Sequence, residues 1–154
     1  MTSPRATAAS TPVAGCFLGF DVGARYLGVA VGDTLTRSAR PLKTLLSQTG
    51  GPDWAGIDAL LTEWRPLALI VGLPLTLDGA EQANSRRARG FAAALAKRSG
   101  KPVHLADERY SSREASKRFA AQRQAGTRRR HHAAALDAMA AAIILENWFH
   151  SPHD

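Results

Sequence analysis

The chain has few of the residues and segments that define several large protein classes. It contains one cysteine, Cys16, in 154 residues, so it can form no internal disulfide and no zinc site built on several thiolates. Aromatic residues make up only 6%, and no apolar run approaches the about 20 residues that a transmembrane helix needs. No long apolar segment near the N-terminus resembles a secretory signal peptide. We therefore expect a cytoplasmic protein with no membrane partner.

The remaining composition is that of one globular domain. Hydrophobic residues make up 45% and charged residues 21%, and the length fits the about 100–200 residues of a single domain. Residues 1–15 are rich in Ser, Thr, Ala and Pro, which predicts a disordered tail. We expect one folded domain over residues 16–150 and a short tail over 151–154.

The basic charge is concentrated in the second half of the chain. Lys and Arg number 20 and Asp and Glu 13, which gives a net charge of +7. Residues 1–77 carry 6 basic and 5 acidic side chains, a net of +1, whereas residues 78–154 carry 14 and 8, a net of +6. The stretch 109–132 has eight basic residues and a single acid, Glu114. Such asymmetry favours a polyanionic partner such as nucleic acid.

The spacing of the apolar residues predicts an α/β fold. Short apolar runs predict five strands, at Phe17–Val22, Leu27–Val31, Ala39–Leu46, Leu67–Leu73 and Pro102–Leu105. Helical spacing and capping signals predict four helices, from a cap at Asp53 to Pro66, and over residues 82–99, 111–124 and 133–148. A basic linker, residues 126–132, precedes the last helix. The order predicts a mixed five-stranded sheet with helices on both faces.

Local signals refine this arrangement. Gly23-Ala24-Arg25 predicts the turn of a hairpin between the first two strands, and Pro41 suits the third strand to a sheet edge. The last helix is expected to bury one apolar stripe. The residues of that stripe are Leu136, Met139, Ala140, Ile143 and Ile144.

Three carboxylates occur where a purely structural core would not place them. Asp21 interrupts an apolar strand, Asp137 lies on the apolar side of the last helix, and Glu108 follows the fifth strand. A buried carboxylate needs a cation or hydrogen-bond donors, so each could instead pair with an arginine or cap a turn. Taken together, a carboxylate set without Cys or His partners is an oxygen-ligand site that suits Mg²⁺ or Mn²⁺. Two such ions about 3.5–4 Å apart support phosphodiester hydrolysis.

Four blocks of the sequence, in order, resemble the YqgF/RuvX family. They are Gly19–Ala30, Leu69–Pro74 with Asp78-Gly79, Asp107-Glu108-Arg109 with Ser111-Ser112, and Asp137 with Ile143-Ile144-Leu145. The resemblance extends from Phe17 to Phe149. It implies an RNase H-like fold of the Holliday-junction-resolvase type and a nuclease that processes the 5′ end of precursor 16S rRNA in ribosome biogenesis.

The resemblance also implies roles for individual residues. Asp21, Glu108 and Asp137 would be both the catalytic residues and the ligands of Mg²⁺ or Mn²⁺, with Asp21 bridging two ions. Many relatives carry a Lys-Arg pair where this chain has Arg25-Tyr26, and a lysine where it has the arginine run before Asp137. Arginine keeps the phosphate contact but not the proton chemistry of a lysine. The expected phosphate-binding residues are Arg25, Arg109, Arg113, Lys117, Arg118, Arg128, Arg129 and Arg130.

Other functions fit parts of the same pattern. A junction resolvase would use the same metal site on branched DNA, as a dimer with two active sites. A non-catalytic RNA-binding assembly factor would use the same basic surface. An actin-like or sugar-kinase ATPase would share the Asp21-x-Gly23 segment but needs two such domains. Residue type alone leaves open whether Asp107, His131 or His132 takes part, and whether the protein is a monomer or a weak homodimer.

Overall fold

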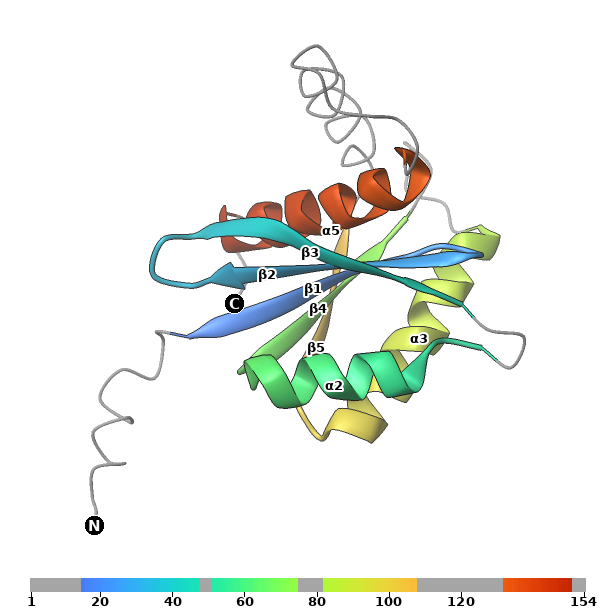
Figure 1. Ribbon diagram of the computed structural model, residues 1–154, viewed down its shortest axis with the longest axis horizontal. Helices are drawn as coiled ribbons and strands as arrows, with labels where there is room; N and C mark the ends of the chain where they lie inside the picture. The colour runs from blue at the N-terminus through green and yellow to red at the C-terminus, as the bar shows by residue number, and fades with distance from the viewer. Residues whose placement is uncertain (1–14, 48–50, 75–81, 108–131, 151–154) are drawn as a thin grey trace.

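The computed structural model describes residues 15–47, 51–74, 82–107 and 132–150. These ranges contain five strands and three helices, in the order β-β-β-α-β-α-β-α (Figure 1). The strands are β1 (Cys16–Val22), β2 (Tyr26–Asp33), β3 (Ser38–Leu46), β4 (Ala68–Leu73) and β5 (Val103–Asp107). The helices are α2 (Trp54–Trp64), α3 (Ala83–Ser99) and α5 (His132–His150).

The strands form one mixed sheet in the order β3-β2-β1-β4-β5. β1 pairs antiparallel with β2 and parallel with β4, so it lies at the centre of the sheet. The predicted turn closes the β1–β2 hairpin, because the amide of Gly23 donates to the carbonyl of Tyr26 at 2.9 Å. β3 is an edge strand, as its proline predicted, and its pairing with β2 shifts register between Val29 and Ala30.

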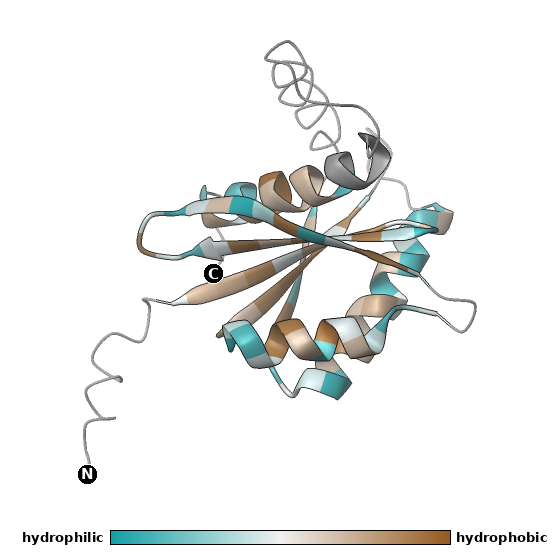
Figure 2. Cartoon of the chain, viewed as in Figure 1, coloured by the Kyte–Doolittle hydropathy of each residue, from teal (hydrophilic) through white to brown (hydrophobic). Residues whose placement is uncertain are grey.

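Helices cover both faces of the sheet, which confirms the predicted fold class. Figure 1 shows α5 on one face and α2 with α3 on the other. Figure 2 shows that the hydrophobic residues of the central strands lie between these helical layers. On the α2–α3 face the core is built from alternate strand residues and the inner sides of the helices. Its fully buried members include Leu18, Phe20, Leu69, Ile57 and Leu95.

The other face of the sheet lies close to α5. Small residues at every second position of β2 face this helix. A Cβ added to Gly28 would lie 2.1 Å from the carbonyl oxygen of Asp137, and one added to Gly32 would lie 2.8 Å from the ring of Phe149. Between them, Ala30 packs with Ala141 and Ala142. Because β2 has no large side chain on this face, the α5 backbone lies almost directly on the sheet at Gly28, and side chains of α5 occupy the space at Gly32.

The predicted elements match the structure closely, with two differences. α5 begins at His132, which the sequence assigned to the preceding linker, and it is buried around its whole middle rather than along one stripe. All eight residues from Ala138 to Leu145 are buried, and all eight are apolar. The fifth strand extends two residues further than predicted, to Asp107.

Several expectations fall outside the described residues. They are the two tails, the helix over residues 111–124 and the linker up to residue 131. None of the described helices is long and apolar enough to cross a bilayer.

Candidate active site

Asp21 lies near the end of the central strand and on the α5 face of the sheet. Its neighbours Leu18 and Phe20 belong to the core on the α2–α3 face. Gly19 lies on the other face, where an added Cβ would meet the Ala141 carbonyl oxygen at 3.1 Å. Because strand residues alternate between faces, Asp21 is on the same side as Gly19. The side chain is half-buried, at the point where β1 leaves the sheet.

Gly28 brings the backbone of Asp137 to this position. Gly28 is the cross-strand partner of Asp21, and the two Cα atoms of such a pair lie about 4.5–5.5 Å apart. An added Cβ at Gly28 would meet the carbonyl oxygen of Asp137 at 2.1 Å and its carbonyl carbon at 2.4 Å. The backbones of Asp21 and Asp137 are therefore separated by little more than one strand spacing. The structure brings these two predicted site residues, 116 positions apart in the sequence, to one end of the sheet.

The environment of Asp137 is unfavourable for an isolated negative charge. The residues that follow it on α5 are buried and apolar. Burial raises the pKa of the Asp137 carboxyl from 3.8 to about 6. A cation at this carboxylate would favour the ionised form and oppose that shift.

The third predicted carboxylate, Glu108, lies outside the described residues, directly after the last residue of β5. Along β5, His104 and Ala106 face α5, whereas Val103 and Leu105 pack with the core on the opposite face. Because strand residues alternate, Asp107 lies on the same face as Val103 and Leu105, and its side chain is exposed. Its place on the other face separates it from Asp21 and Asp137.

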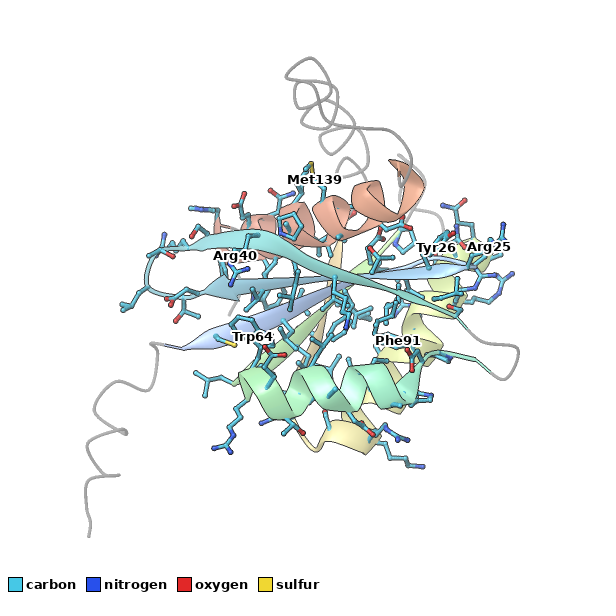
Figure 3. All side chains as sticks on the ribbon, viewed as in Figure 1. Arg25, Tyr26, Arg40, Trp64, Phe91 and Met139 are labelled. Atoms are coloured by element: carbon cyan, nitrogen blue, oxygen red, sulfur yellow. The ribbon has the colours of Figure 1, made fainter. Side chains whose placement is uncertain are left out.

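Arg25 is the one predicted phosphate-binding residue within the described ranges. It is exposed in the β1–β2 turn, four residues after Asp21, and Figure 3 shows it beside Tyr26 at the end of the sheet. Its carbonyl accepts a hydrogen bond from the amide of Ser47 at 2.7 Å, which fixes the turn to the end of β3. The other predicted contacts lie outside the described residues: Arg109, Arg113, Lys117, Arg118, Arg128, Arg129 and Arg130.

The two described carboxylates suit a divalent metal by their chemistry. Both offer oxygen ligands only, which is the donor set that Mg²⁺ and Mn²⁺ prefer. The desolvated carboxyl of Asp137 is a group that a cation would stabilise in its ionised form. In the part of the chain that the structure describes, no group of three or more His, Cys, Asp or Glu residues forms a complete set of metal ligands. A third ligand would have to come from beyond those residues.

Two of the three tryptophans pack against other side chains of the fold. Trp54 stacks on Phe91 with ring centroids 5.6 Å apart, and Arg98 covers it at 5.1 Å. Trp148 stacks on His104 at 5.1 Å. These rings are held within the fold, as expected for packing residues.

Asp33, the last residue of β2, has a structural role. Its carboxylate accepts a hydrogen bond from the amide of Leu35 at 2.7 Å, which closes the turn after β2. It therefore caps a turn.

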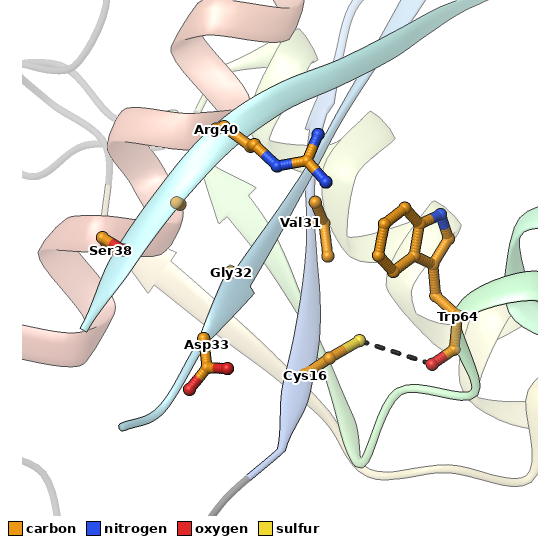
Figure 4. A pocket seen from close by; sticks show the side chains of 8 residues that line it. Cys16, Val31, Gly32, Asp33, Ser38, Arg40 and Trp64 are labelled. Carbon is orange, nitrogen blue, oxygen red and sulfur yellow. Dashed lines mark hydrogen bonds between the residues drawn. The ribbon is translucent and has the colours of Figure 1, made fainter. Parts of the chain in front are cut away.

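A hollow at the opposite end of β1 does not share the metal-ligand chemistry of Asp21 and Asp137. Cys16 lines it together with Arg40 and Trp64 (Figure 4), and its thiol donates to the Trp64 carbonyl at 3.5 Å. Burial, followed by the nearby Asp33 carboxylate, raises the pKa of the Cys16 thiol. The thiol is therefore a poor nucleophile at neutral pH. Among the described residues of this lining, Asp33 is the one carboxylate, so they give no paired set of ligands.

Sequence reasoning missed the part that Gly28 has in the site. It recorded this glycine only as a member of a motif. The available signal was the alternation of Gly28, Ala30 and Gly32 along one strand, which predicts close approach of another backbone.

The chain is similar to known proteins in sequence and in fold. Residues 15–151 match the family model RuvX, which is described as a Holliday junction resolvase. A protein of Xanthomonas campestris pv. campestris strain B100, named "Putative pre-16S rRNA nuclease", is 51% identical over 135 residues, covering 88% of this chain and 87% of that protein. A protein of the same name from Xanthomonas axonopodis pv. citri strain 306 is 50% identical over 138 residues, covering 90% and 89%.

Solved structures give the fold. RuvC of Thermus thermophilus, in complex with a Holliday junction substrate, aligns with a TM-score of 0.53 at 22% identity, covering 88% of this chain and 94% of RuvC. The fowlpox virus resolvase, in complex with its substrate junction, also aligns with a TM-score of 0.53, at 13% identity and with coverage of 88% and 97%. The fold is RNase H-like, as the sequence resemblance implied.

Proposed function

The chain belongs to the RuvX family, and from this membership and the geometry at the end of β1 we propose that it is a metal-dependent nuclease acting on precursor 16S rRNA. The observation that carries the proposal is the approach of the backbones of two acidic residues through one glycine. Asp21 pairs with Gly28, and Gly28 lies against the carbonyl of Asp137. A fold stabilised only by packing has no need for two acidic side chains at this contact.

Asp21, Asp137 and Glu108 are the residues that would hold Mg²⁺ or Mn²⁺. We assign Asp21 the position between the two ions, because it lies on β1, the central strand of the sheet. We assign Glu108 as the third ligand, because it is the next residue in the alternating series of His104 and Ala106, which face α5. When bound, the divalent ions would stabilise the negative charge on the attacking and leaving oxygens of the phosphodiester.

Basic residues around this site would position the substrate backbone. Arg25 lies exposed in the turn that follows Asp21, within reach of a strand that crosses the carboxylates. We assign the same phosphate contact to Arg109, Arg113, Lys117, Arg118 and Arg128–Arg130. Such contacts hold and orient nucleic acid without selecting its sequence. Processing of the 5′ end of the precursor, in the cytoplasm during ribosome biogenesis, is the role that we propose for this reaction.

A branched DNA junction is the second candidate substrate. The family description names Holliday junction resolution, and the same carboxylate set would serve either polymer. A resolvase makes paired incisions and therefore needs two active sites in a dimer. Substrate preference and oligomeric state on the junction together separate the two functions.

The decisive experiment compares both substrates in one assay. Labelled precursor 16S rRNA and a synthetic four-way DNA junction are incubated with the wild-type protein in Mn²⁺, in Mg²⁺ and in EDTA. We expect cleavage of the rRNA precursor that EDTA abolishes and that Asp21→Asn lacks. Preferred cleavage of the junction by a dimer would replace the RNA assignment with the DNA one. Binding of RNA with no cleavage in any metal would identify a non-catalytic assembly factor.

A further inference from the structure

Another hollow lies at the Asp21 end of the sheet, on the face opposite to the carboxylates. Its volume is about 430 Å³, within the about 300–1,000 Å³ typical of small-ligand sites. Its walls come from the β1–β2 turn, from the start of α2 and from one side of α3, the helix that Figure 1 shows beneath this end of the sheet. We call it the α3 hollow. Val22, which follows Asp21 directly, is part of its wall.

The charges at the α3 hollow favour an anion. Arg86 and Arg87 line it at the start of α3, a helix whose first turn contains no acidic residue. Arginines at a helix N-terminus are unfavourable, because this end of the helix already carries a partial positive charge. Arg87 donates to the neutral side-chain oxygen of Asn84, and in the described ranges neither arginine has a carboxylate partner. Two arginines and a positive helix end therefore line the hollow, and no described carboxylate pairs with either arginine.

The arginines are carried on a fixed helix end. Ser85 is fully buried, accepts a hydrogen bond from the Gln82 amide at 3.0 Å and donates to the carbonyl of Pro74. These bonds join the first turn of α3 to the segment after β4. The positive end of the hollow is thus pre-organised by a buried contact.

The rest of the α3 hollow is apolar and open. Phe91 and Trp54 stack on one another and border it, and Gly90 lies on the same side of α3. A Cβ added to Gly90 would meet nothing within 4 Å, so packing does not require a glycine here. Glycine weakens a helix interior relative to alanine, and its effect at this position is to keep the hollow open. A ligand matching these walls has an anionic end and a flat apolar body.

We propose that the α3 hollow binds one unpaired nucleotide of the substrate strand, with its phosphate on Arg86 and Arg87 and its base against the apolar wall. The inference rests on the proposed function, since it takes the ligand to be part of the cleaved polymer. A base within a duplex is stacked and paired, so only an unpaired nucleotide can enter. A basic groove that follows the backbone is a usual means of binding single strands. The base would lie along the apolar wall and not stack on Trp54, because the ring of Trp54 already contacts Phe91 and Arg98.

The position of the β1–β2 turn connects the α3 hollow to the carboxylates. Asp21 faces α5, Val22 faces the hollow, and Arg25 is exposed in the turn between the two faces. A strand with its scissile phosphate at Asp21 would cross this turn and place a neighbouring nucleotide in the hollow. The site thereby selects a single-stranded region beside the cleaved bond.

Two variants and one control test the proposal. Arg86→Gln with Arg87→Gln removes the anion contact. Gly90→Leu adds a side chain at the wall of the hollow, where a Cβ meets nothing within 4 Å, and leucine is the better helix former. Lys97→Gln with Lys101→Gln removes the same charge from the far end of α3. The titrants are a short single-stranded oligoribonucleotide, adenosine monophosphate and inorganic phosphate, followed by amide chemical shifts in EDTA.

We expect the oligonucleotide to shift the amides of Gly90 and Ala94, and each hollow variant to weaken its binding about ten- to hundredfold. The control should bind within about threefold of wild type, allowing for its lost charge. Equal weakening by the control, or shifts produced fully by phosphate alone, would overturn the nucleotide assignment. Tight binding of adenosine monophosphate with unchanged oligonucleotide affinity would indicate a free-nucleotide site instead.

The measurement is independent of cleavage. An inactive protein whose α3 hollow binds the oligonucleotide would refute only the proposed catalytic function. An active enzyme whose two hollow variants cleave and bind like wild type would refute only the hollow.

Discussion

Gly28 lies directly beneath the carbonyl of Asp137, so closely that a single added methyl group would be 2.1 Å from that oxygen. Since Gly28 is also the cross-strand partner of Asp21, this one contact sets the separation of the two carboxylates. The sheet and α5 are held at backbone distance, and the start of α5 cannot rise without moving Asp137 away from Asp21.

Gly28→Ala is therefore expected to destabilise the fold and to impair the site. Overpacking of a close contact costs about 1–3 kcal/mol, because strand and helix must move apart. Urea denaturation measures the free energy of unfolding, and the precursor-cleavage assay measures the effect on the site.

Gly90→Ala is the matched control for the stability measurement, since an added Cβ there meets nothing within 4 Å. It should stabilise the protein by about 0.5–1 kcal/mol through helix propensity alone. A Gly28→Ala protein as stable and as active as wild type would show that the strand–helix contact does not hold the carboxylates in place.

Asp137 is expected to make the metal-free protein less stable as the pH rises. Its folded-state pKa of about 6 is above the ordinary value of 3.8, so the folded state binds this proton more tightly than the unfolded state does. The stabilising contribution is complete below about pH 4 and is lost as the pH rises to about 6.

Comparison with Asp137→Asn isolates this effect. In EDTA the variant should be more stable than wild type above pH 6, and the difference should shrink towards pH 4. Urea titrations across this range measure it. A difference that does not change with pH would mean that Asp137 ionises in the fold as it does in the unfolded chain.

A divalent metal should make the wild-type protein more stable than Asp137→Asn, the reverse of the order expected in EDTA above pH 6. Mg²⁺ or Mn²⁺ that binds the folded carboxylates raises the free energy of unfolding of wild type by mass action. Asp137→Asn and Asp21→Asn should gain less, since each removes a ligand charge. Thermal unfolding at pH 7.5 with increasing Mn²⁺ tests this without any substrate. Equal shifts in wild type and both variants would show that the ions bind elsewhere.

Much of the fold follows from patterns that act over short distances. The strand boundaries came within two residues because turns, prolines and apolar runs are local signals. The exception was α5, where helical periodicity predicted one stripe but Ala138–Leu145 is buried throughout. The close contact on the sheet side follows from the small residues of β2, far away in the sequence, and burial on the remaining sides depends on tertiary packing that helical periodicity does not encode.

The sequence predicts which residues belong to the site, but not which of them lie close together. An acid within an apolar strand, as at Asp21, is visible in the sequence, because the cost of burying a charge demands an explanation. Its proximity to Asp137 depends on strand pairing and helix placement, which no local pattern encodes. The α3 hollow gave no sequence signal for a similar reason. Arg86 and Arg87 resemble any exposed helical charges until the β1–β2 turn is placed beside them.

The carboxylates should act as one unit in cleavage. Asp21→Asn, Asp137→Asn and Glu108→Gln each preserve side-chain size and remove one ligand charge, so each should abolish divalent-dependent cleavage while keeping the fold. Because the ions are held jointly, the double variant Asp21→Asn with Asp137→Asn should be little worse than either single variant. Single-turnover rates on the rRNA precursor measure these losses. Multiplicative losses would indicate independent roles instead of a shared metal site.

The arginine run before α5 is expected to contact phosphates and not bases. Binding to single strands weakens with salt by roughly 0.7 log units per log unit of salt for each phosphate contacted. Replacing Arg128, Arg129 and Arg130 with Gln should therefore flatten the salt dependence of RNA binding by about two units, whatever the sequence of the RNA. Fluorescence anisotropy over a range of salt concentrations measures the slope. The Lys97→Gln, Lys101→Gln protein controls for lost charge, and a triple variant that keeps the wild-type slope would exclude this run from the substrate path.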